Sequence, residues 1–422
     1  MIKSVNINIQ ADSSKVVESC QVCGYQELEP IFFLGYLPPV NTMHDIGEKP
    51  HEQPSYPAQL LYCPHCRLVQ LGLIVDLKIL FPPTYPYTSS TTKILRENFA
   101  ELHNECKTIV DLGHDDLIID IGSNDGNLLN NFKENHRVLG VTPEDMGKIA
   151  IRRGIPTIID YFNPKTAEKI LSKYGRAKII TATNVFAHIE NINEILDCII
   201  KLLAPDGVFI SESHYLMSLI KTLQYDTIYH EHLRYYSLHS LKYLLSLHGL
   251  EVIHAKMIPT HGGSIRVYAA KKGKYKPKKT VAKLLKMEKR THLGRKELLE
   301  FRDNVVISKL KLHSLLLKIK KQGKHICGIG APSRASTLIN YVGIDDGILD
   351  YVLEVKGSYK IGKYIPGTLI PVLDESHLIK NQPDYALLLS WHIAEELATK
   401  LREKGFRGKF ILPLPEPKLL KI

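Results

Sequence analysis

Short apolar runs alternate with amphipathic stretches through the middle of the chain, and glycine, proline or polar residues bound each run. Apolar runs of this length between turn residues are typical of buried strands. Strands that alternate with helices favour parallel pairing through crossover helices. The pattern therefore predicts an α/β core with a doubly wound sheet. We expect strands at 117–121, 137–141, 157–159, 177–181 and 207–212, and a helix before them at 90–106.

A second α/β pattern follows towards the C-terminus. Helical periodicity with few breakers predicts one or two long helices over 281–321. Beyond them we expect a helix at 333–341 and strands at 347–353, 385–389 and 410–412. Residues 1–85 differ, because they are rich in Pro, Tyr and Cys. A chain of 422 residues exceeds one ordinary core. We expect three domains, at 1–85, 86–275 and 276–422.

The net charge of +11 is concentrated in one segment. Residues 271–290 hold ten basic residues and one acidic residue. A solvated linker and helix face explains this charge, and an anionic partner is the alternative. Tyr275 is the one aromatic residue of the segment, which weakens a single-strand nucleic-acid interpretation. We expect no nucleic-acid partner.

The composition, with 44% hydrophobic residues, is that of a soluble globular protein. No apolar run reaches the roughly 18 residues that a membrane span needs. The first residues show no apolar segment followed by a small-residue cleavage site. We expect a cytoplasmic monomer without membrane contact.

Two Cys-x-x-Cys pairs stand near the N-terminus, at Cys20 and Cys23 and at Cys63 and Cys66. In a cytoplasmic protein such pairs favour metal binding over a disulfide. Together they supply the four thiolates of a tetrahedral structural Zn²⁺ site. Buried or redox-active pairs are the alternative, but a thioredoxin-like site needs only one pair. The 39 residues between Cys23 and Cys63 must form a folded insertion.

A glycine-containing loop follows the first predicted strand, with Asp120, Gly122, Asn124, Asp125 and Gly126. It lacks the Gly-x-Gly-x-x-Gly of dinucleotide binders. Its Asp-x-Gly-x-x-x-Gly pattern is similar to the first motif of class I S-adenosylmethionine (SAM) methyltransferases. Glycines let the backbone approach the methionyl part of SAM, and Asp120 can take its ammonium. A purely structural strand–turn–helix is the alternative.

Other candidate cofactor residues follow the later strands. Thr142 stands where the second strand of this fold usually ends in an acidic residue that grips the ribose, and Glu144 is a possible substitute. Asp160 and Tyr161 suit the amino group and the face of the adenine. Asn184, after the fourth strand, is assigned to the same cofactor.

Residues Tyr229, His230, Glu231 and His232 place proton donors and acceptors in direct succession. Both imidazoles titrate near neutral pH. On a strand, His230 and His232 would share one face and could bind a metal. Alternatively, the cluster forms hydrogen bonds in a polar core. A lone His188 is more often a satisfied core histidine than a catalytic one.

Nearly the whole chain resembles the SAM-dependent sugar C-methyltransferases, which methylate nucleotide-linked 4-keto-deoxysugars, typically at C3. The resemblance implies a zinc-binding N-terminal domain, a SAM-binding core and a C-terminal Rossmann-like α/β domain over the active site. It rests on the cysteine pairs and on segments 85–90, 120–126, 184–188, 226–232, 261–266, 328–332 and 364–368.

The resemblance also implies catalytic roles. A carbon beside a ketone becomes nucleophilic when a general base removes its proton and donors stabilise the enolate oxygen. His232 or Tyr229 is the implied base, and Glu231 orients or tunes its neighbour. His188 takes a polar role at the keto or hydroxyl group. We favour His232, because a tyrosine base needs a pKa lowered by several units.

Binding roles are implied in the same way. Tyr85, Tyr87 and Ser90 are expected to close over the methionyl group of SAM. The substrate, a dTDP- or GDP-linked sugar, is expected to meet residues of two segments. These substrate-binding residues are His261, Gly263 and Arg266 in one segment, and Ser333 and Arg334 in the other. Residues 354–363 depart from the family, which has an Asp-centred segment ending in Lys-Gln-Gly.

Two other functions stay open. One is a SAM methyltransferase that acts on oxygen or nitrogen of a related small molecule. The run from Tyr229 to His232 argues against it, because a hydroxyl is methylated without enolate chemistry. The other is a zinc-ribbon methyltransferase that binds RNA through residues 271–290.

Overall fold

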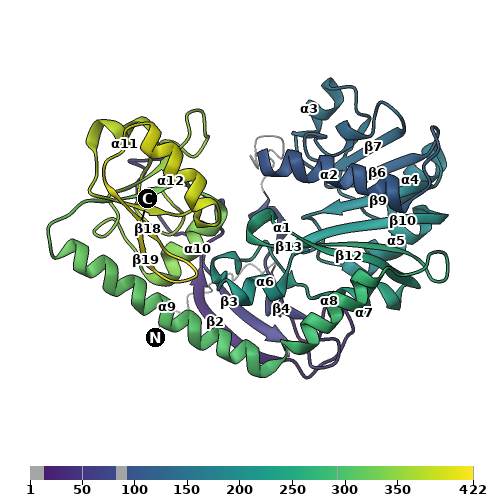
Figure 1. Cartoon of the computed structure of the whole chain (residues 1–422), viewed down its shortest axis with the longest axis horizontal. Coiled ribbons are helices and arrows are strands. Elements are labelled where there is room, and N and C mark those ends of the chain that lie inside the picture. The colour runs from purple at the N-terminus through teal and green to yellow at the C-terminus, as the bar shows by residue number, and fades with distance from the viewer. Residues whose placement is uncertain (1–13, 50, 82–92, 292, 422) are drawn as a thin grey trace, which may run out of the picture.

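The computed structural model describes residues 14–49, 51–81, 93–291 and 293–421. One α/β lobe, in blue and teal, and another, in green and yellow, lie on opposite sides of the molecule (Figure 1). The N-terminal strands and helix α9 (Arg295–Lys320) connect these lobes along one edge. The described chain is therefore organised as an N-terminal unit between two α/β lobes.

The larger sheet forms the blue and teal lobe. Its strands are β6 (Leu117–Ile121), β7 (Arg137–Thr142), β8 (Thr157–Ile159), β9 (Ala177–Thr183), β10 (Leu203–His214), β12 (Leu250–Ile258) and β13 (Ser264–Lys271). They lie in the order β12-β13-β10-β9-β6-β7-β8. Strand β13 is antiparallel to both of its neighbours, and the strands from β10 to β8 pair in parallel. This arrangement confirms the predicted class I methyltransferase core, although the apolar pattern does not predict the β12–β13 pair.

Burial on both faces explains why β6 is apolar except for Asp120. Leu117, Ile119 and Ile121 join one core cluster, whereas Ile118 joins the cluster on the opposite face. Helices cover both faces, so the strand shows no polar alternation. The first cluster contains residues of α4 (Pro164–Tyr174), α5 (Ile192–Leu202), α7 (Leu238–Leu247) and α8 (Lys279–Arg290). The second contains residues of α2 (Lys93–Ile109) and α3 (Gly147–Arg152).

The N-terminal sheet includes a strand from far along the chain. Strands β2 (Glu29–Leu37), β3 (Tyr56–Tyr62) and β4 (Val69–Leu71) are antiparallel, and β11 (Arg234–Tyr235) pairs with β4. The short strands β1 (Lys15–Val16) and β5 (Leu73–Ile74) pair beside them, and α1 (Leu77–Leu80) follows. The residues directly after His232 are thus held against the N-terminal domain.

The C-terminal lobe confirms the predicted Rossmann-like domain. Its sheet order is β16-β15-β14-β17-β18-β19, parallel except for the last pair. The strands are β14 (Ile326–Ile329), β15 (Tyr351–Glu354), β16 (Val372–Asp374), β17 (Tyr385–Leu388), β18 (Lys409–Leu412) and β19 (Lys418–Leu420). The helices are α10 (Ser333–Val342), α11 (Ser376–Asn381) and α12 (Ala394–Glu403).

The predicted strand at 347–353 is wrong in its first half. Asp345 accepts a hydrogen bond from the amide of Gly347, at 3.1 Å, and its carbonyl accepts one from Leu349. An aspartate that bonds its own backbone two residues on favours a turn over a strand. Strand β15 therefore begins only at Tyr351.

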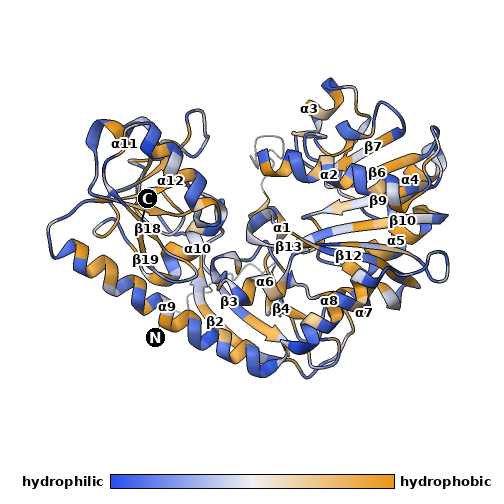
Figure 2. Ribbon diagram, in the orientation of Figure 1, coloured by the Kyte–Doolittle hydropathy of each residue, from blue (hydrophilic) through white to orange (hydrophobic). Residues whose placement is uncertain are grey.

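The stretch over 281–321 forms two helices, as predicted. Helix α8 ends at Arg290, and Gly294 precedes α9 with its amide donating to Glu297. Bands of blue and orange alternate along α9, whereas β6 and β7 are largely orange (Figure 2). An apolar stripe on a mostly polar helix is expected for a helix that buries one face. Among the helices described, none is both long and apolar enough to cross a membrane.

A buried charged network fastens α2 to the larger sheet. Arg266 of β13 is fully buried, and its Nε lies 2.6 Å from Glu212 of β10. Its Nη1 donates to Glu101 and Glu105 at 3.0 and 2.9 Å, and its Nη2 donates to Asn98 at 2.8 Å. Burial by itself would raise the pKa of Glu105, but hydrogen bonds from His254, Tyr268 and Arg266 lower it to about 2. The positive charge of Arg266 thus stabilises the carboxylates of Glu101, Glu105 and Glu212 inside the protein.

We expect Arg266→Met to lower the free energy of unfolding by about 3–5 kcal/mol, because it leaves buried carboxylates without their cation. Lys256→Met is the matched control, since Lys256 pairs with Glu101 and Glu105 near the surface. That exposed pair should be worth less than about 1 kcal/mol. Urea unfolding measures both variants, and equal losses would contradict this account of the network.

Candidate functional site

The cysteine pairs form one four-sulfur cluster. The Sγ atoms of Cys20 and Cys66 lie 3.4 Å apart, and those of Cys23 and Cys63 lie 3.6 Å apart. Sulfurs bound at 2.3 Å around a tetrahedral Zn²⁺ lie about 3.8 Å apart, whereas a disulfide bond is about 2.05 Å long. The cluster therefore fits Zn²⁺ and excludes disulfides between these pairs.

Each cysteine pair sits in its own backbone turn, and the two turns have the same geometry. The amide of Gly24 donates to the Cys20 carbonyl, and the amide of Arg67 donates to the Cys63 carbonyl. Gly24 and Arg67 both have positive φ, at 73° and 59°. The shared geometry shows a structural role, since four thiolates leave no open position for a catalytic metal.

The predicted cofactor loop lies at the carboxyl end of β6. Gly122 has a φ of 74°, and an added Cβ would lie 2.2 Å from Val185, so this position requires glycine. Asp120 is buried and accepts a hydrogen bond from Thr181 at 2.6 Å. Burial raises the pKa of Asp120 to about 7, although the bond from Thr181 opposes the shift. A cation placed beside Asp120 would favour its charged form.

Thr142 and Glu144 act together at the end of β7. The Thr142 hydroxyl donates to the Glu144 carboxylate at 2.5 Å, with Thr142 fully buried. Burial, and then the Glu144 carboxylate, raises the pKa of Tyr161, which indicates that Glu144 lies near this tyrosine. Asp160 accepts from the amide of Tyr161, and both residues are exposed. An acidic group thus stands where the usual carboxylate is missing.

The remaining predicted cofactor residues differ in whether their polar groups have partners within the protein. Asp125 is fully buried and pairs with Arg153 at 3.1 Å. Asn124 has a φ of 49° within the loop, and Asn184 has a φ of 58° at the end of β9. The Oδ1 atom of Asn184 and the Oγ atom of Ser123 are buried without a hydrogen-bond partner among the described residues. Such atoms are expected where a polar ligand completes the site.

Three further cofactor predictions, Tyr85, Tyr87 and Ser90, lie outside the described residues. Helix α2, which follows them, is fixed to the sheet by the Arg266 network.

An imidazole cluster, made of His188, His214, His232 and His261, lies beside the cofactor loop's edge of the sheet. The His232 ring centroid lies 5.0 Å from that of His188 and 4.8 Å from that of His214. His214 lies 5.5 Å from His261, and Tyr229 lies 4.2 Å from His232. The rings come from the ends of β9 and β10, from the turn before β11, and from the turn between β12 and β13.

Backbone carbonyls fix the tautomers of two of these rings. Nδ1 of His232 lies 2.8 Å from the Thr227 carbonyl, and Nδ1 of His188 lies 2.5 Å from the Glu231 carbonyl. A carbonyl oxygen only accepts, so each Nδ1 must carry the hydrogen. The Nε2 atoms of both rings therefore keep a lone pair that can take a proton.

Burial keeps the cluster neutral. Desolvation lowers the pKa of His188, and it lowers those of His214 and His232 well below the ordinary value. Arg334 adds to the shift at His214, His232 and His261, because a second cation beside a guanidinium is unfavourable. Desolvation and then the Glu231 carboxylate raise the pKa of Tyr229 well above its usual value. Tyr229 is therefore a donor at neutral pH, whereas His232 is an acceptor.

The adjacent His230 points elsewhere. Its Nε2 lies 3.3 Å from the Pro57 carbonyl, and its ring meets Tyr56 of the N-terminal sheet. Residues 229–232 form a turn, closed by the His232 amide and the Tyr229 carbonyl, and not a strand. The idea that His230 and His232 share one face and bind a metal is therefore wrong.

Arg334 joins the C-terminal lobe to the imidazole cluster. Its Nε lies 2.9 Å from Asp226, and its Nη2 donates to Gln224 and Asp226. Trp391 donates to the same Asp226 at 2.7 Å and lies under the guanidinium. A buried cation of α10 is thus held beside the loop that carries His232. Its predicted contact with a nucleotide diphosphate stays a prediction.

A hydrogen-bonded chain links all parts of the molecule at Glu231. Ser333 of α10 donates to Asn41 at 3.0 Å, and Asn41 of the N-terminal domain donates to the Glu231 carboxylate at 2.7 Å. The same carboxylate acts electrostatically on Tyr359 and Lys360 of the C-terminal lobe. The Glu231 side chain therefore contacts the N-terminal domain and acts electrostatically on Tyr229 and on the C-terminal lobe.

The other predicted substrate residues differ in what they offer. Every guanidinium nitrogen of Arg266 is engaged within the protein. A Cβ at Gly263 would lie 2.7 Å from Ser218, so this glycine serves close packing. His261 has a φ of 55°, and its buried Nε2 is without a partner among the described residues. Of these residues, His261 presents a free polar atom to the site.

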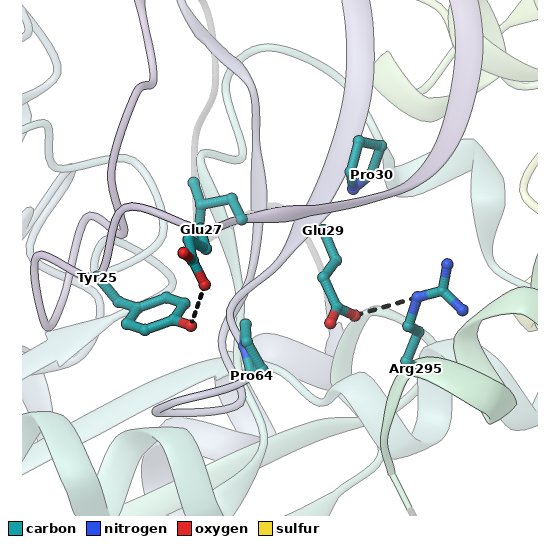
Figure 3. A pocket seen from close by; sticks show the side chains of 7 residues that line it. Tyr25, Glu27, Glu29, Pro30, Pro64 and Arg295 are labelled. Atoms are coloured by element: carbon teal, nitrogen blue, oxygen red, sulfur yellow. Dashed lines mark hydrogen bonds and ion pairs between the residues drawn. The ribbon is translucent and has the colours of Figure 1, made fainter.

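A surface hollow of about 600 Å³ lies elsewhere, beside the four-sulfur cluster. Glu29 at the start of β2 pairs there with Arg295 at the start of α9, at 3.1 Å (Figure 3). Tyr25, another lining residue, donates to Glu27 (Figure 3). None of the lining residues belongs to the imidazole cluster. The hollow lies instead where Arg295 of α9 contacts Glu29 of the N-terminal domain.

Sequence reasoning missed His214, Asn41 and Asp226 as parts of the site. His214 had a usable signal, because it ends β10 at the edge where parallel strands place their ligands. Asn41 and Asp226 carry no local pattern that indicates their partners. Their roles come from residues more than 100 positions away in the sequence.

Comparison with known proteins agrees with this geometry. The chain is 31% identical over 416 residues to "C-methyltransferase NovU" of Streptomyces niveus, covering 97% of this chain and 98% of that protein. Family models match residues 20–81 ("Putative zinc binding domain"), 94–255 ("Methyltransferase domain") and 259–415 ("C-methyltransferase C-terminal domain").

The similarity to two solved methyltransferase structures is lower. A SAM-dependent methyltransferase from Clostridium acetobutylicum is 13% identical with a TM-score of 0.33, over 44% of this chain and 94% of its own. A magnesium protoporphyrin IX methyltransferase from Synechocystis is 13% identical with a TM-score of 0.32, over 42% of this chain and 82% of its own.

From the predicted role of Asp120 we expect SAM affinity to rise with pH through about 7, because only the ionised carboxylate would pair with the ammonium of SAM. Below that pH the carboxyl is protonated and the ion pair is lost. Asp120→Asn should weaken binding by about 10–100-fold, the loss of one charged hydrogen bond, and flatten the pH dependence. Calorimetric titration between pH 6 and 8 tests this, and an unchanged pH dependence in the variant would rule Asp120 out.

Proposed function

The chain belongs to the SAM-dependent C-methyltransferases, and we propose that its substrate is a nucleotide-linked 4-keto-deoxysugar methylated at C3. The likeness to NovU supports methyl transfer to carbon. The finer assignment of the substrate is supported by the chemistry that the imidazole cluster can perform. Methylation of carbon requires a proton acceptor and a stabilised enolate, which a simple oxygen or nitrogen acceptor does not.

One observation carries the proposal: the hydrogen bond from Nδ1 of His232 to the Thr227 carbonyl. It leaves Nε2 of a neutral, buried imidazole as the proton acceptor. His232 Nε2 takes the proton from C3, and the electron pair of that C–H bond moves towards the C4 oxygen to form the enolate. The negative charge that develops raises the proton affinity of His232 when it is needed.

Other residues stabilise the enolate in this proposal. The Arg334 guanidinium supplies positive charge beside the cluster, and Tyr229 remains protonated and donates a hydrogen bond. His188 and His261 present further polar atoms towards the sugar. Bound SAM supplies a methyl group already activated on a sulfonium.

The cofactor side is assigned to the edge formed by β6, β7 and β9. Asp120 takes the ammonium of SAM, and Glu144, oriented by Thr142, takes the ribose in place of the usual acidic residue. The exposed residues Asp160 and Tyr161 lie at the outer edge of this cofactor site and contact the adenine. Asn184 and Ser123 carry the buried atoms that a bound cofactor would satisfy.

The test is incubation in heavy water with SAM and a panel of dTDP- and GDP-linked 4-keto-deoxysugars. The native protein should exchange deuterium into C3 and add one methyl group. His232→Asn should lose both reactions by about 10²–10⁴-fold, the usual contribution of a general base, while SAM binding persists. Asparagine can still donate to the Thr227 carbonyl, so the loop is expected to keep its shape.

His230→Asn is the matched control, because its ring faces Pro57 rather than the cluster. It should retain most of the exchange activity. Full exchange in His232→Asn would remove His232 as the base, and loss in Tyr229→Phe alone would transfer the role to Tyr229. If the native protein exchanges none of the panel, the substrate class is wrong.

A further inference from the structure

The loop after β2 crosses from the N-terminal domain onto the C-terminal lobe. Its residues His44, Asp45 and Ile46 pair with residues 362–364 there. Tyr364 donates its amide to the His44 carbonyl at 2.8 Å, and Ile46 donates its amide to Gly362 at 2.9 Å. Lys363 binds the Asp45 carboxylate at 2.6 Å. The loop therefore fastens one domain to another.

His44, Glu48 and His51 come together at the outer side of this loop. Their ligand atoms all lie within 4.8 Å of one another. Nδ1 of His44 lies 3.5 Å from Glu48, and Nδ1 of His51 lies 3.8 Å from it. The two imidazole rings are 4.5 Å apart. Glu48 is itself oriented by the amide of Asp45, at 3.2 Å.

These separations are close to those around a metal ion. Nitrogen and oxygen ligands at about 2.1 Å from a tetrahedral Zn²⁺ lie about 3.4 Å apart. The 3.5 Å between His44 and Glu48 is already close to this value. Nδ1 of His51 lies 3.1 Å from the Lys49 carbonyl, so His51 offers its Nε2 atom instead, and the ligand atoms of the three residues lie within 4.8 Å of one another. The three side chains also line one cavity of about 40 Å³ with Tyr364 and Leu369 of the C-terminal lobe. A water needs roughly 10–15 Å³, so the cavity has room for an ion and a water ligand.

We propose that His44, Glu48 and His51 form a second divalent-metal site that stabilises the fold of this loop where it packs on the C-terminal lobe. Two imidazoles and one carboxylate suit Zn²⁺ and related transition-metal ions better than Ca²⁺ or Mg²⁺. The site differs from the four-sulfur cluster in its ligands and its exposure. Because its histidines are partly exposed, we expect this site to exchange its metal ion with solvent. The mostly buried thiolates of the four-sulfur cluster are expected to retain their ion.

The position gives the ion a consequence for the active site. Asn41, which donates to Glu231, lies three residues before His44 in the same loop. The loop pairs with residues 362–364 through His44, Asp45 and Ile46. An ion that holds His44 and His51 would restrict the part of the loop that follows this pairing. It thus stiffens the loop that carries Asn41, the residue that donates to Glu231.

Zinc titration of the full-length protein tests the proposal. The native protein should hold one zinc that survives a mild chelator and one that the chelator removes. His51→Gln and His44→Gln should each lose the exchangeable zinc and keep the other. His114→Gln, an exposed histidine outside the cluster, is the matched control and should keep both.

Cobalt identifies the ligands independently. Added to protein from which a mild chelator has removed the exchangeable zinc, one equivalent of Co²⁺ should give ligand-field absorption without a thiolate charge-transfer band. The proposal is overturned if no second equivalent binds, if the second equivalent persists in His51→Gln, or if its spectrum shows thiolate ligation.

Discussion

The buried ion pair between Asp226 and Arg334 is the interaction on which the site depends. It joins α10 of the C-terminal lobe to the loop that carries His232, and Trp391 and Gln224 bind the same two groups. Breaking a buried pair leaves an uncompensated charge, which costs more than the pair itself contributes. The pair therefore holds a permanent cation beside the imidazole cluster. Burial lowers the pKa values of the histidines, and the cation disfavours imidazolium further at His214, His232 and His261, so these rings remain neutral and able to accept a proton.

The larger sheet explains why the cofactor loop and the imidazole cluster meet. Parallel strands β6, β7, β9 and β10 end at one edge, so the side chains that follow them converge there. Asp120, Thr142 and His214 all reach the site in this way. The turn at 229–232 has no strand of the larger sheet beneath it, and β11 anchors it instead through its pairing with β4. The N-terminal domain thus positions the proposed base, His232, and also carries the four-sulfur cluster.

Local patterns predicted much of this arrangement. Continuous apolar strands, paired cysteines and a glycine loop are signals within short segments, and the structure confirms the α/β lobes and the four-sulfur cluster. The opposite directions of His230 and His232 could not be predicted, because they depend on a turn that tertiary pairing fixes. The sequence likewise assigns Arg266 to the substrate, yet its partners on α2 lie more than 160 residues away. The sequence around a charged residue does not indicate whether its side chain will bind a ligand or pair with a buried carboxylate.

The central claim is that His232 is a neutral imidazole with its hydrogen on Nδ1 and its lone pair on Nε2. Nitrogen-15 NMR of protein labelled in its histidine rings measures this directly, with His232→Asn identifying the signals. The account predicts a protonated Nδ1 and an unprotonated Nε2 for His232 at neutral pH. An imidazolium signal, or the tautomer with its hydrogen on Nε2, would contradict it.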